Sequence, residues 1–201
     1  MTTKTTWVIV LIKDFNSAKQ RLQPALGPKA RRELARRNAQ LAVRAAARAG
    51  DRVLVVAGSE EVATLAEGWG ADVLAEPRQE GQNVAAARGI AKAVEGGAGA
   101  VLLLSSDLPL ITVDAVRDVL ETAARLEAPV AVAVPAVGRG GTNALYLRPP
   151  HAITLHFGSD SLAKFRQEAQ SSGVEFVIHH SDAMALDLDE PGDLARLRRA
   201  V

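Results

Sequence analysis

The chain has 201 residues, which is long enough for one α/β domain with a sizeable core and too short for two, so we expect a single domain over residues 1–201. Hydrophobic residues make up 48% and charged residues 23%, and 24 Lys and Arg against 23 Asp and Glu leave a net charge of +1, which does not indicate a nucleic-acid or membrane partner. The sequence contains no cysteine, which excludes disulfides, thiolate metal sites and thiol nucleophiles.

Short apolar runs alternate with segments of helical periodicity through the first two thirds of the chain. The apolar runs predict buried strands, and the longer segments, in which apolar residues recur on one face, predict helices. We expect Thr112 to be the N-cap of the last helix in this part, with Asp114 in its first turn. The predicted order is strand 7–12, helix 28–49, strand 52–57, helix 60–67, strand 71–75, helix 83–94, strand 100–104 and a helix from residue 112 to about residue 126.

The last third of the chain has a different pattern, with strands joined by a glycine-rich segment. We expect strands at 130–135 and 143–147, a helix near 161–171, strands at 175–179 and 184–189, and a final helix from Pro191. Alternation of strands and helices predicts parallel strands with crossover helices. The sequence therefore predicts an α/β fold of three layers, with a Rossmann-like, mixed and mostly parallel sheet.

No apolar stretch approaches the roughly 18 residues that span a bilayer. The N-terminal segment is polar and leads straight into the first predicted strand, which does not fit a signal peptide. We therefore expect a cytoplasmic protein.

Three aspartates form the acidic part of the candidate site. Asp107 follows the apolar run 100–104, and strand periodicity over 184–189 would place Asp187 and Asp189 on one face. Carboxylate oxygens suit Mg²⁺ or Mn²⁺, so these residues are candidate metal ligands. The alternative is that Asp107 caps a helix, or that Asp189 or Glu190 caps the helix that Pro191 opens. The four histidines lack zinc-ligand spacing.

Basic residues follow the first predicted strand. Lys13, Lys19 and Arg21 flank the loop that leads away from it, near the edge of the sheet where ligands bind in open α/β folds. They are candidates for neutralising phosphates, with Arg21 able to hold two oxygens at once. A solvated polar face is the alternative interpretation.

Two later segments could also bind an anion. The glycine-rich turn 138–143 could bring backbone N–H groups close to a phosphate or carboxylate, and segment 157–161 opens a helix whose first N–H groups could do the same. A plain connection between strands and an ordinary N-cap at Ser159 are the respective alternatives.

In this order, the segments resemble the phospholactate/phosphoenolpyruvate guanylyltransferase family of coenzyme F-420 biosynthesis. The similarity covers nearly the whole chain, and the Gly-Thr-Asn-Ala-Leu segment is its most specific element. A histidine commonly closes the Phe-Gly segment in this family, and Phe165 stands in its place. The segments that carry the resemblance are Ile12-Lys13, Ala18-Lys19-Gln20-Arg21-Leu22, Ser106-Asp107-Leu108-Pro109-Leu110, Gly138-Arg139-Gly140-Gly141-Thr142-Asn143-Ala144-Leu145, Phe157-Gly158 with Ser161, and Asp187-Leu188-Asp189-Glu190-Pro191.

The resemblance implies a nucleotidyltransferase fold related to GT-A glycosyltransferases and a role for each matching segment. The implied metal ligands are Asp107, Asp187 and Asp189, which would hold Mg²⁺ or Mn²⁺. The implied catalytic residues are Lys13, Lys19, Arg21 and Asp107. The implied acceptor-binding residues are Thr142, Asn143, Gly158 and Ser161, and the implied nucleotide-binding residues are Lys13, Asn83 and Ser106.

The activity that the resemblance implies is transfer of GMP from GTP to a three-carbon phosphoester, with release of pyrophosphate. Phosphoenolpyruvate is the favoured acceptor and 2-phospho-L-lactate the second, and a downstream biosynthetic transferase would take up the product. The alternatives are a molybdopterin guanylyltransferase, a cytidylyltransferase, a GT-A glycosyltransferase or a non-catalytic nucleotide-binding protein. The first two generally have a glycine-rich loop after the first strand, whereas this chain has no glycine there before Gly27.

Overall fold

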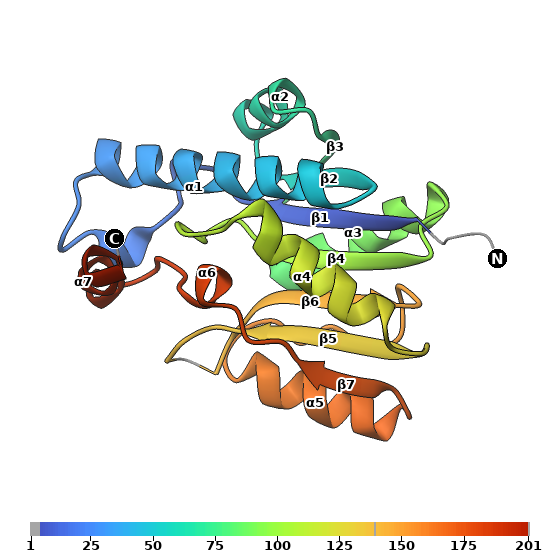
Figure 1. The fold of residues 1–201 in the computed structure, drawn as a ribbon. Coiled ribbons are helices and arrows are strands. Elements are labelled where there is room, and N and C mark those ends of the chain that lie inside the picture. The colour runs from blue at the N-terminus through green and yellow to red at the C-terminus, as the bar shows by residue number, and fades with distance from the viewer. Residues whose placement is uncertain (1–4, 139, 201) are drawn as a thin grey trace.

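Seven strands form one sheet in the computed structural model, which describes residues 5–138 and 140–200 (Figure 1). The strands are β1 (Thr6–Ile12), β2 (Arg52–Ala57), β3 (Asp72–Ala75), β4 (Ala100–Ser105), β5 (Val130–Pro135), β6 (Thr142–Arg148) and β7 (Glu175–Ile178). The helices are η1 (Gln20–Leu22), α1 (Pro28–Ala49), α2 (Glu60–Gly68), α3 (Gln82–Glu95), α4 (Val113–Ala124), α5 (Ser161–Ser171), α6 (Asp182–Ala185) and α7 (Pro191–Ala200).

The strand order is β3-β2-β1-β4-β6-β5-β7. All neighbouring pairs are parallel except the two that involve β6, which runs antiparallel to β4 and to β5. The prediction of a mixed, mostly parallel sheet is therefore confirmed.

The two faces of the sheet bury separate hydrophobic cores, as alternation along each strand requires. On β1, Val8, Val10 and Ile12 lie in the core covered by α1, α2 and α4, whereas Trp7 and Ile9 lie in the core covered by α3 and α5. The fold thus has three layers, helices–sheet–helices (Figure 1).

Gly89 allows α3 to pack closely on the sheet, so a larger residue at this position should destabilise the fold. A Cβ at this position would lie 2.8 Å from Ile9 Cγ2 and 2.9 Å from Val56 Cγ2. We expect Gly89→Ala to lower the free energy of unfolding by about 1–3 kcal/mol, because overpacking outweighs the better helix propensity of alanine. Gly68→Ala is the matched control, since a Cβ there meets nothing within 4 Å. Chemical denaturation of both variants tests this, and equal stability of the two would contradict it.

The carboxyl ends of β1 and β4, two neighbouring strands in the middle of the sheet, lie side by side, because Leu11 pairs with Ser105. We call this end of the two strands the β1–β4 edge. From β1 the chain crosses through α1 to β2 on one side, while β4 lies on the other side. Ligands in open α/β sheets bind at such a switch point. Because β6 is antiparallel to β4, its first residue, Thr142, starts at this same edge.

The prediction of a strand at 184–189 is wrong. Residues Asp182–Ala185 form the short helix α6, and the chain then continues without strand pairing to Pro191. The burial alternation that suggested the strand is nevertheless present, with Leu186 and Leu188 buried and Asp187 and Asp189 partly exposed. The alternation therefore indicates an extended chain that packs on the core, but the backbone groups of this segment do not bond to a neighbouring strand.

The other predicted elements are present, with their ends as predicted or shifted by one or two residues. Thr112 is the N-cap of α4, because its side chain accepts a hydrogen bond from Ala115 N at 3.1 Å. None of the helices in the described part of the chain is both long and apolar enough to cross a membrane.

Candidate active site at the β1–β4 edge

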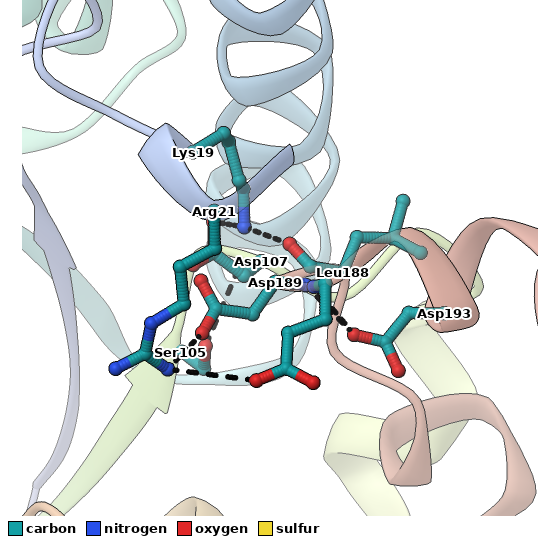
Figure 2. A network of polar contacts seen from close by, with 8 residues as sticks. Lys19, Arg21, Ser105, Asp107, Leu188, Asp189 and Asp193 are labelled. Carbon is teal, nitrogen blue, oxygen red and sulfur yellow. Dashed lines mark hydrogen bonds and ion pairs between the residues drawn. The ribbon is translucent and has the colours of Figure 1, made fainter. Parts of the chain in front are cut away.

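Lys19 is a buried cation at the edge of the sheet. The chain leaves β1, and Lys19 then adopts a left-handed conformation (φ 59°) immediately before η1. Its side chain is only 2% exposed, and Nζ lies 2.8 Å from Asp107 Oδ1. Lys19 Nζ also donates a hydrogen bond to the carbonyl oxygen of Leu188 (Figure 2). The ammonium group therefore joins three segments that are far apart in the sequence.

Asp107 occupies the position that the sequence predicted, just beyond β4. Its backbone N–H donates to Ser105 Oγ at 3.3 Å, and its carbonyl oxygen accepts from Leu188 N at 3.1 Å. The carboxylate is 39% exposed, so it faces both Lys19 and solvent. Asp107 does not cap α4, which is the role of Thr112.

Arg21 and Asp189 form the outer part of the same network. Arg21 Nη1 lies 2.9 Å from Asp189 Oδ2 and 3.9 Å from Glu190 Oε1, and its side chain is 68% exposed. Figure 2 shows Lys19 and Arg21 approaching the acidic groups from the η1 side. Two cations and two predicted metal ligands thus lie together, bridged by the backbone of Leu188.

Asp193 is part of this network, and our sequence analysis missed it. Its side chain lies in the first turn of α7, and Oδ2 accepts hydrogen bonds from Asp189 N at 3.0 Å and Glu190 N at 2.8 Å. The signal in the sequence was an acid two residues after Pro191, at the third helical position, from which a side chain can reach back to the preceding N–H groups.

The acidic groups have the oxygen donors that Mg²⁺ and Mn²⁺ prefer. As they lie, no three Asp, Glu, His or Cys side chains among the described residues converge on one point that could hold a metal. Magnesium is commonly held by one or two carboxylates together with substrate phosphates and water. Asp107 and Asp189, which are partly exposed and fixed through Leu188, fit that arrangement. Asp187 is partly exposed and lies two residues before Asp189 in the sequence.

Thr142 and Ser161 are in contact beside the carboxyl ends of β1 and β4, and Gly158 precedes Ser161 by three residues in the sequence. Ser161 Oγ donates to Thr142 Oγ1 at 3.0 Å, and Ser161 is 1% exposed. Leu162 N donates to Gly140 O at 3.1 Å, so the start of β6 and the first turn of α5 are held together. Ser159 is not the N-cap of α5, because that position is Asp160, in a left-handed conformation. Arg139, in the same glycine-rich turn, lies outside the described residues.

Asn143, predicted to bind the acceptor, has its amide group bonded to the backbone. Its Nδ2 donates to Met184 O at 2.8 Å and to Ala185 O at 3.1 Å, and the residue is 4% exposed. These bonds join β6 to the end of α6, just before the acidic segment. Asn143 therefore positions the chain that carries Asp187 and Asp189.

Asn83, predicted to bind the nucleotide, makes a reciprocal pair with Phe157. Asn83 Nδ2 donates to Phe157 O at 3.1 Å, and Phe157 N donates to Asn83 Oδ1 at 2.8 Å. This pair fastens the loop that carries Gly158 to the first turn of α3. Lys13 is exposed directly after β1, and Ser106 is partly exposed between Ser105 and Asp107.

Phe165, which stands where the family commonly has histidine, is a core residue. It is fully buried on α5, and its ring meets the Phe157 ring edge-on at a centroid distance of 5.1 Å. By filling this core, Phe165 stabilises the helix that presents Ser161.

On the outer side of α5, hydrogen bonds from Thr154 and then from His156 lower the pKa of Glu168.

A cleft of about 530 Å³ lies elsewhere, between α4 and segment 179–183. None of the predicted site residues lines it. Its lining contains the carboxylates of Asp114, Asp118, Glu121 and Asp182, against one arginine, Arg125. Carboxylates outnumber cations in this lining, and the cleft holds none of the residues that the sequence predicts for the site, so we do not assign the nucleotide to it.

Comparison with known proteins finds relatives that match most of the chain. Phosphoenolpyruvate guanylyltransferase of Rubrobacter xylanophilus is 42% identical over 95% of this chain and 92% of its own length. The 2-phospho-L-lactate guanylyltransferase of Methanothermobacter thermautotrophicus is 33% identical over 96% and 83%. The 3-phospho-D-glycerate guanylyltransferase of Phenylobacterium zucineum is 35% identical over 74% and 67%.

Solved structures show the same fold at low identity. A Desulfovibrio desulfuricans protein assigned to the nucleotide-diphospho-sugar transferases has a TM-score of 0.77 at 19% identity, over 97% of this chain and 87% of its own. A Mycobacterium tuberculosis protein solved in complex with manganese has a TM-score of 0.61 at 17% identity, over 98% and 100%. The family model described as guanylyl transferase CofC-like matches residues 6–198. The chain belongs to the CofC-like guanylyl transferase family and is a nucleotidyltransferase.

Proposed function

We propose that the protein transfers GMP from GTP to the phosphate of phosphoenolpyruvate, releasing pyrophosphate, as a step of coenzyme F-420 biosynthesis. The observation that carries the proposal is the paired network at the switch point, in which Lys19 and Arg21 meet Asp107 and Asp189. Family membership supports the reaction class, and the name of the Rubrobacter relative supports the acceptor.

In the proposed reaction, an oxygen of the acceptor's phosphate forms a bond to the α-phosphorus of GTP. The bond from that phosphorus to the oxygen bridging the β-phosphate breaks, and pyrophosphate leaves with the electron pair. The nucleophile is already an anion at neutral pH, so no base has to remove a proton. The protein's task is to bring two polyanions together in line.

The network offers the charges that this task requires. Lys19 and Arg21 would supply positive charge that offsets the repulsion between phosphates, and Asp107 and Asp189, with Asp187 two residues before Asp189, would hold Mg²⁺ or Mn²⁺. A bound divalent ion would supply positive charge at the transferring and leaving phosphates. The manganese complex of a protein of the same fold supports a divalent ion, without selecting between the two metals.

The acceptor would lie by Thr142, Gly158 and Ser161. The hydroxyl pair of Thr142 and Ser161 lies at the opening of α5, where helix N–H groups favour an anion such as a carboxylate. Phosphoenolpyruvate and 2-phospho-L-lactate both carry a carboxylate beside a phosphate. We place phosphoenolpyruvate first because its enzyme in Rubrobacter is the more similar, at 42% identity against 33% for the phospholactate enzyme of Methanothermobacter.

One experiment tests the proposal. The purified protein is incubated with Mg²⁺, each of the four nucleoside triphosphates, and phosphoenolpyruvate, 2-phospho-L-lactate or 3-phospho-D-glycerate, and products are identified by mass. We expect kcat/KM for GTP to exceed that for ATP by about 100-fold or more, because groups that pair with the guanine edge are left unpaired by adenine. We expect phosphoenolpyruvate to be the best acceptor.

The outcomes separate the parts of the proposal. Comparable rates with GTP and ATP would contradict guanylyl selectivity. A clear preference for 2-phospho-L-lactate or 3-phospho-D-glycerate would change the acceptor and leave the reaction intact. A labile product requires a coupled assay, in which a downstream transferase traps it. No pyrophosphate release with any pair would remove the proposed activity.

A further inference from the structure

The segment that carries Asp189 is fastened through its backbone. Leu188 N donates to Asp107 O at 3.1 Å, and Leu188 O accepts from Lys19 Nζ. The next two N–H groups, of Asp189 and Glu190, both donate to one oxygen of Asp193, at 3.0 and 2.8 Å. Since no strand pairs with this segment, these bonds set its course across the edge of the sheet.

Asp193 is suited to this task by burial and charge. The residue is 3% exposed, and its second oxygen lies 3.4 Å from Arg196 Nη1. A carboxylate that accepts two backbone N–H groups makes charge-assisted bonds, and it also lies at the positive end of the α7 dipole. The backbone on both sides of the Asp189 Cα is therefore held, and the Asp189 carboxylate meets Arg21 at 2.9 Å (Figure 2).

The two side-chain caps of α2 and α4 differ from Asp193 in where they reach. Ser59 accepts from Val62 N, and Thr112 accepts from Ala115 N, so each bonds to its own helix. Asp193 instead reaches out of α7, back to Asp189. A bond in that direction orients a residue of the site and also caps the N-terminus of α7.

We propose that Asp193 is a positioning residue for Asp189, holding that carboxylate where it can share a divalent ion with Asp107. This inference rests on the proposed metal-binding role of Asp189. Its physical basis is that ligands lose affinity when the groups that orient them are removed, typically by about 10–100-fold for a metal site. Asp193 itself contacts the backbone of Asp189 and Glu190 and is assigned no contact with substrate.

The test measures metal affinity as well as turnover. Dissociation constants for Mn²⁺ are determined by electron paramagnetic resonance, with a non-hydrolysable GTP analogue bound, for the wild type, Asp193→Ala, Asp193→Asn and Thr112→Ala. We expect Asp193→Ala to weaken Mn²⁺ binding by about tenfold or more and to lower kcat. Asp193→Asn keeps the shape and an accepting oxygen, so we expect a smaller loss of about threefold or more, because the charge is gone.

Thr112→Ala is the matched control, since it removes a helix cap from α4 without touching the segment that carries Asp189. We expect its Mn²⁺ affinity to equal that of the wild type. Wild-type Mn²⁺ affinity in folded Asp193→Ala would overturn the inference, and should that variant not fold, wild-type affinity in Asp193→Asn would overturn it. A wild type that binds no Mn²⁺ with the nucleotide would instead overturn the proposed metal site, and the inference with it.

Discussion

Asp107→Asn is expected to reduce kcat/KM by about 100-fold or more, a loss on the order of 3 kcal/mol in transition-state stabilisation. The substitution keeps the shape of the side chain and the backbone bonds to Ser105 and Leu188, and removes the charge that would bind the metal. Lys19 keeps an oxygen acceptor on the new amide and the carbonyl of Leu188.

The fold should survive this change. The Asp107 carboxylate is 39% exposed, but the Lys19 ammonium that it pairs with is buried, so we expect the free energy of unfolding to fall by about 1–3 kcal/mol while Lys19 stays bonded to Leu188 O and to the new amide oxygen. Asp72→Asn is the matched control, because Asp72 begins β3 and pairs with Arg52 at 2.6 Å, away from the carboxyl ends of the strands. Steady-state kinetics and thermal unfolding check both variants. Near-normal turnover by folded Asp107→Asn would refute the assignment.

The architecture could be predicted from the sequence because the apolar pattern of each element indicates whether it is a strand or a helix and which side of it is buried. Buried parallel strands read as unbroken apolar runs, as at Val101–Leu104, and amphipathic helices read by their spacing. Residues just after such strands fall at the ligand-binding edge whatever the details of packing. For this reason the sequence predicts both Lys19 and Asp107 as site residues, and the structure brings these two residues, 88 positions apart, to a 2.8 Å contact.

In the segment around Leu188, the apolar pattern predicted a strand that is not present. Its alternation of buried and exposed residues is what a strand would give, but a strand also needs a neighbour to pair with, and sequence periodicity does not identify pairing partners. The partners here are Asn143, Lys19 and Asp193, which lie at different distances along the chain.

Side-chain direction was the other missing information. The family resemblance implies ligand-binding roles for Asn83 and Asn143, whereas both have amide groups bonded to the backbone of a neighbouring segment. An amide can bind a ligand or a backbone equally well, since it offers the same donor and acceptor to each. Both asparagines still affect the site, because the loops they hold carry Gly158 and the acidic segment.

Lys19→Met is expected to cause a second large loss of activity. The methionine side chain is unbranched and similar in length to that of lysine, so it fills the same buried space. Both residues bear the same cost of the left-handed backbone conformation at position 19, so the substitution does not change that cost. What the substitution removes is the charge beside Asp107 and the hydrogen bond to Leu188 O. The variant thus isolates the ammonium group.

The loss should be mainly in kcat, by about 100-fold or more, because repulsion between GTP and the acceptor phosphate is greatest as the new bond forms. Stability should fall by about 1–3 kcal/mol, since the buried Leu188 carbonyl loses a donor. The control is Lys92→Met, which removes an exposed lysine that pairs with Glu95 at 3.6 Å on α3. Initial rates at saturating GTP, with a folded fraction measured by circular dichroism, distinguish lost chemistry from lost fold. Removal of an electrostatic stabiliser should cost far more than about threefold. If folded Lys19→Met retains turnover within about threefold of the wild type, the ammonium group has no part in the reaction and Lys19 is a structural residue.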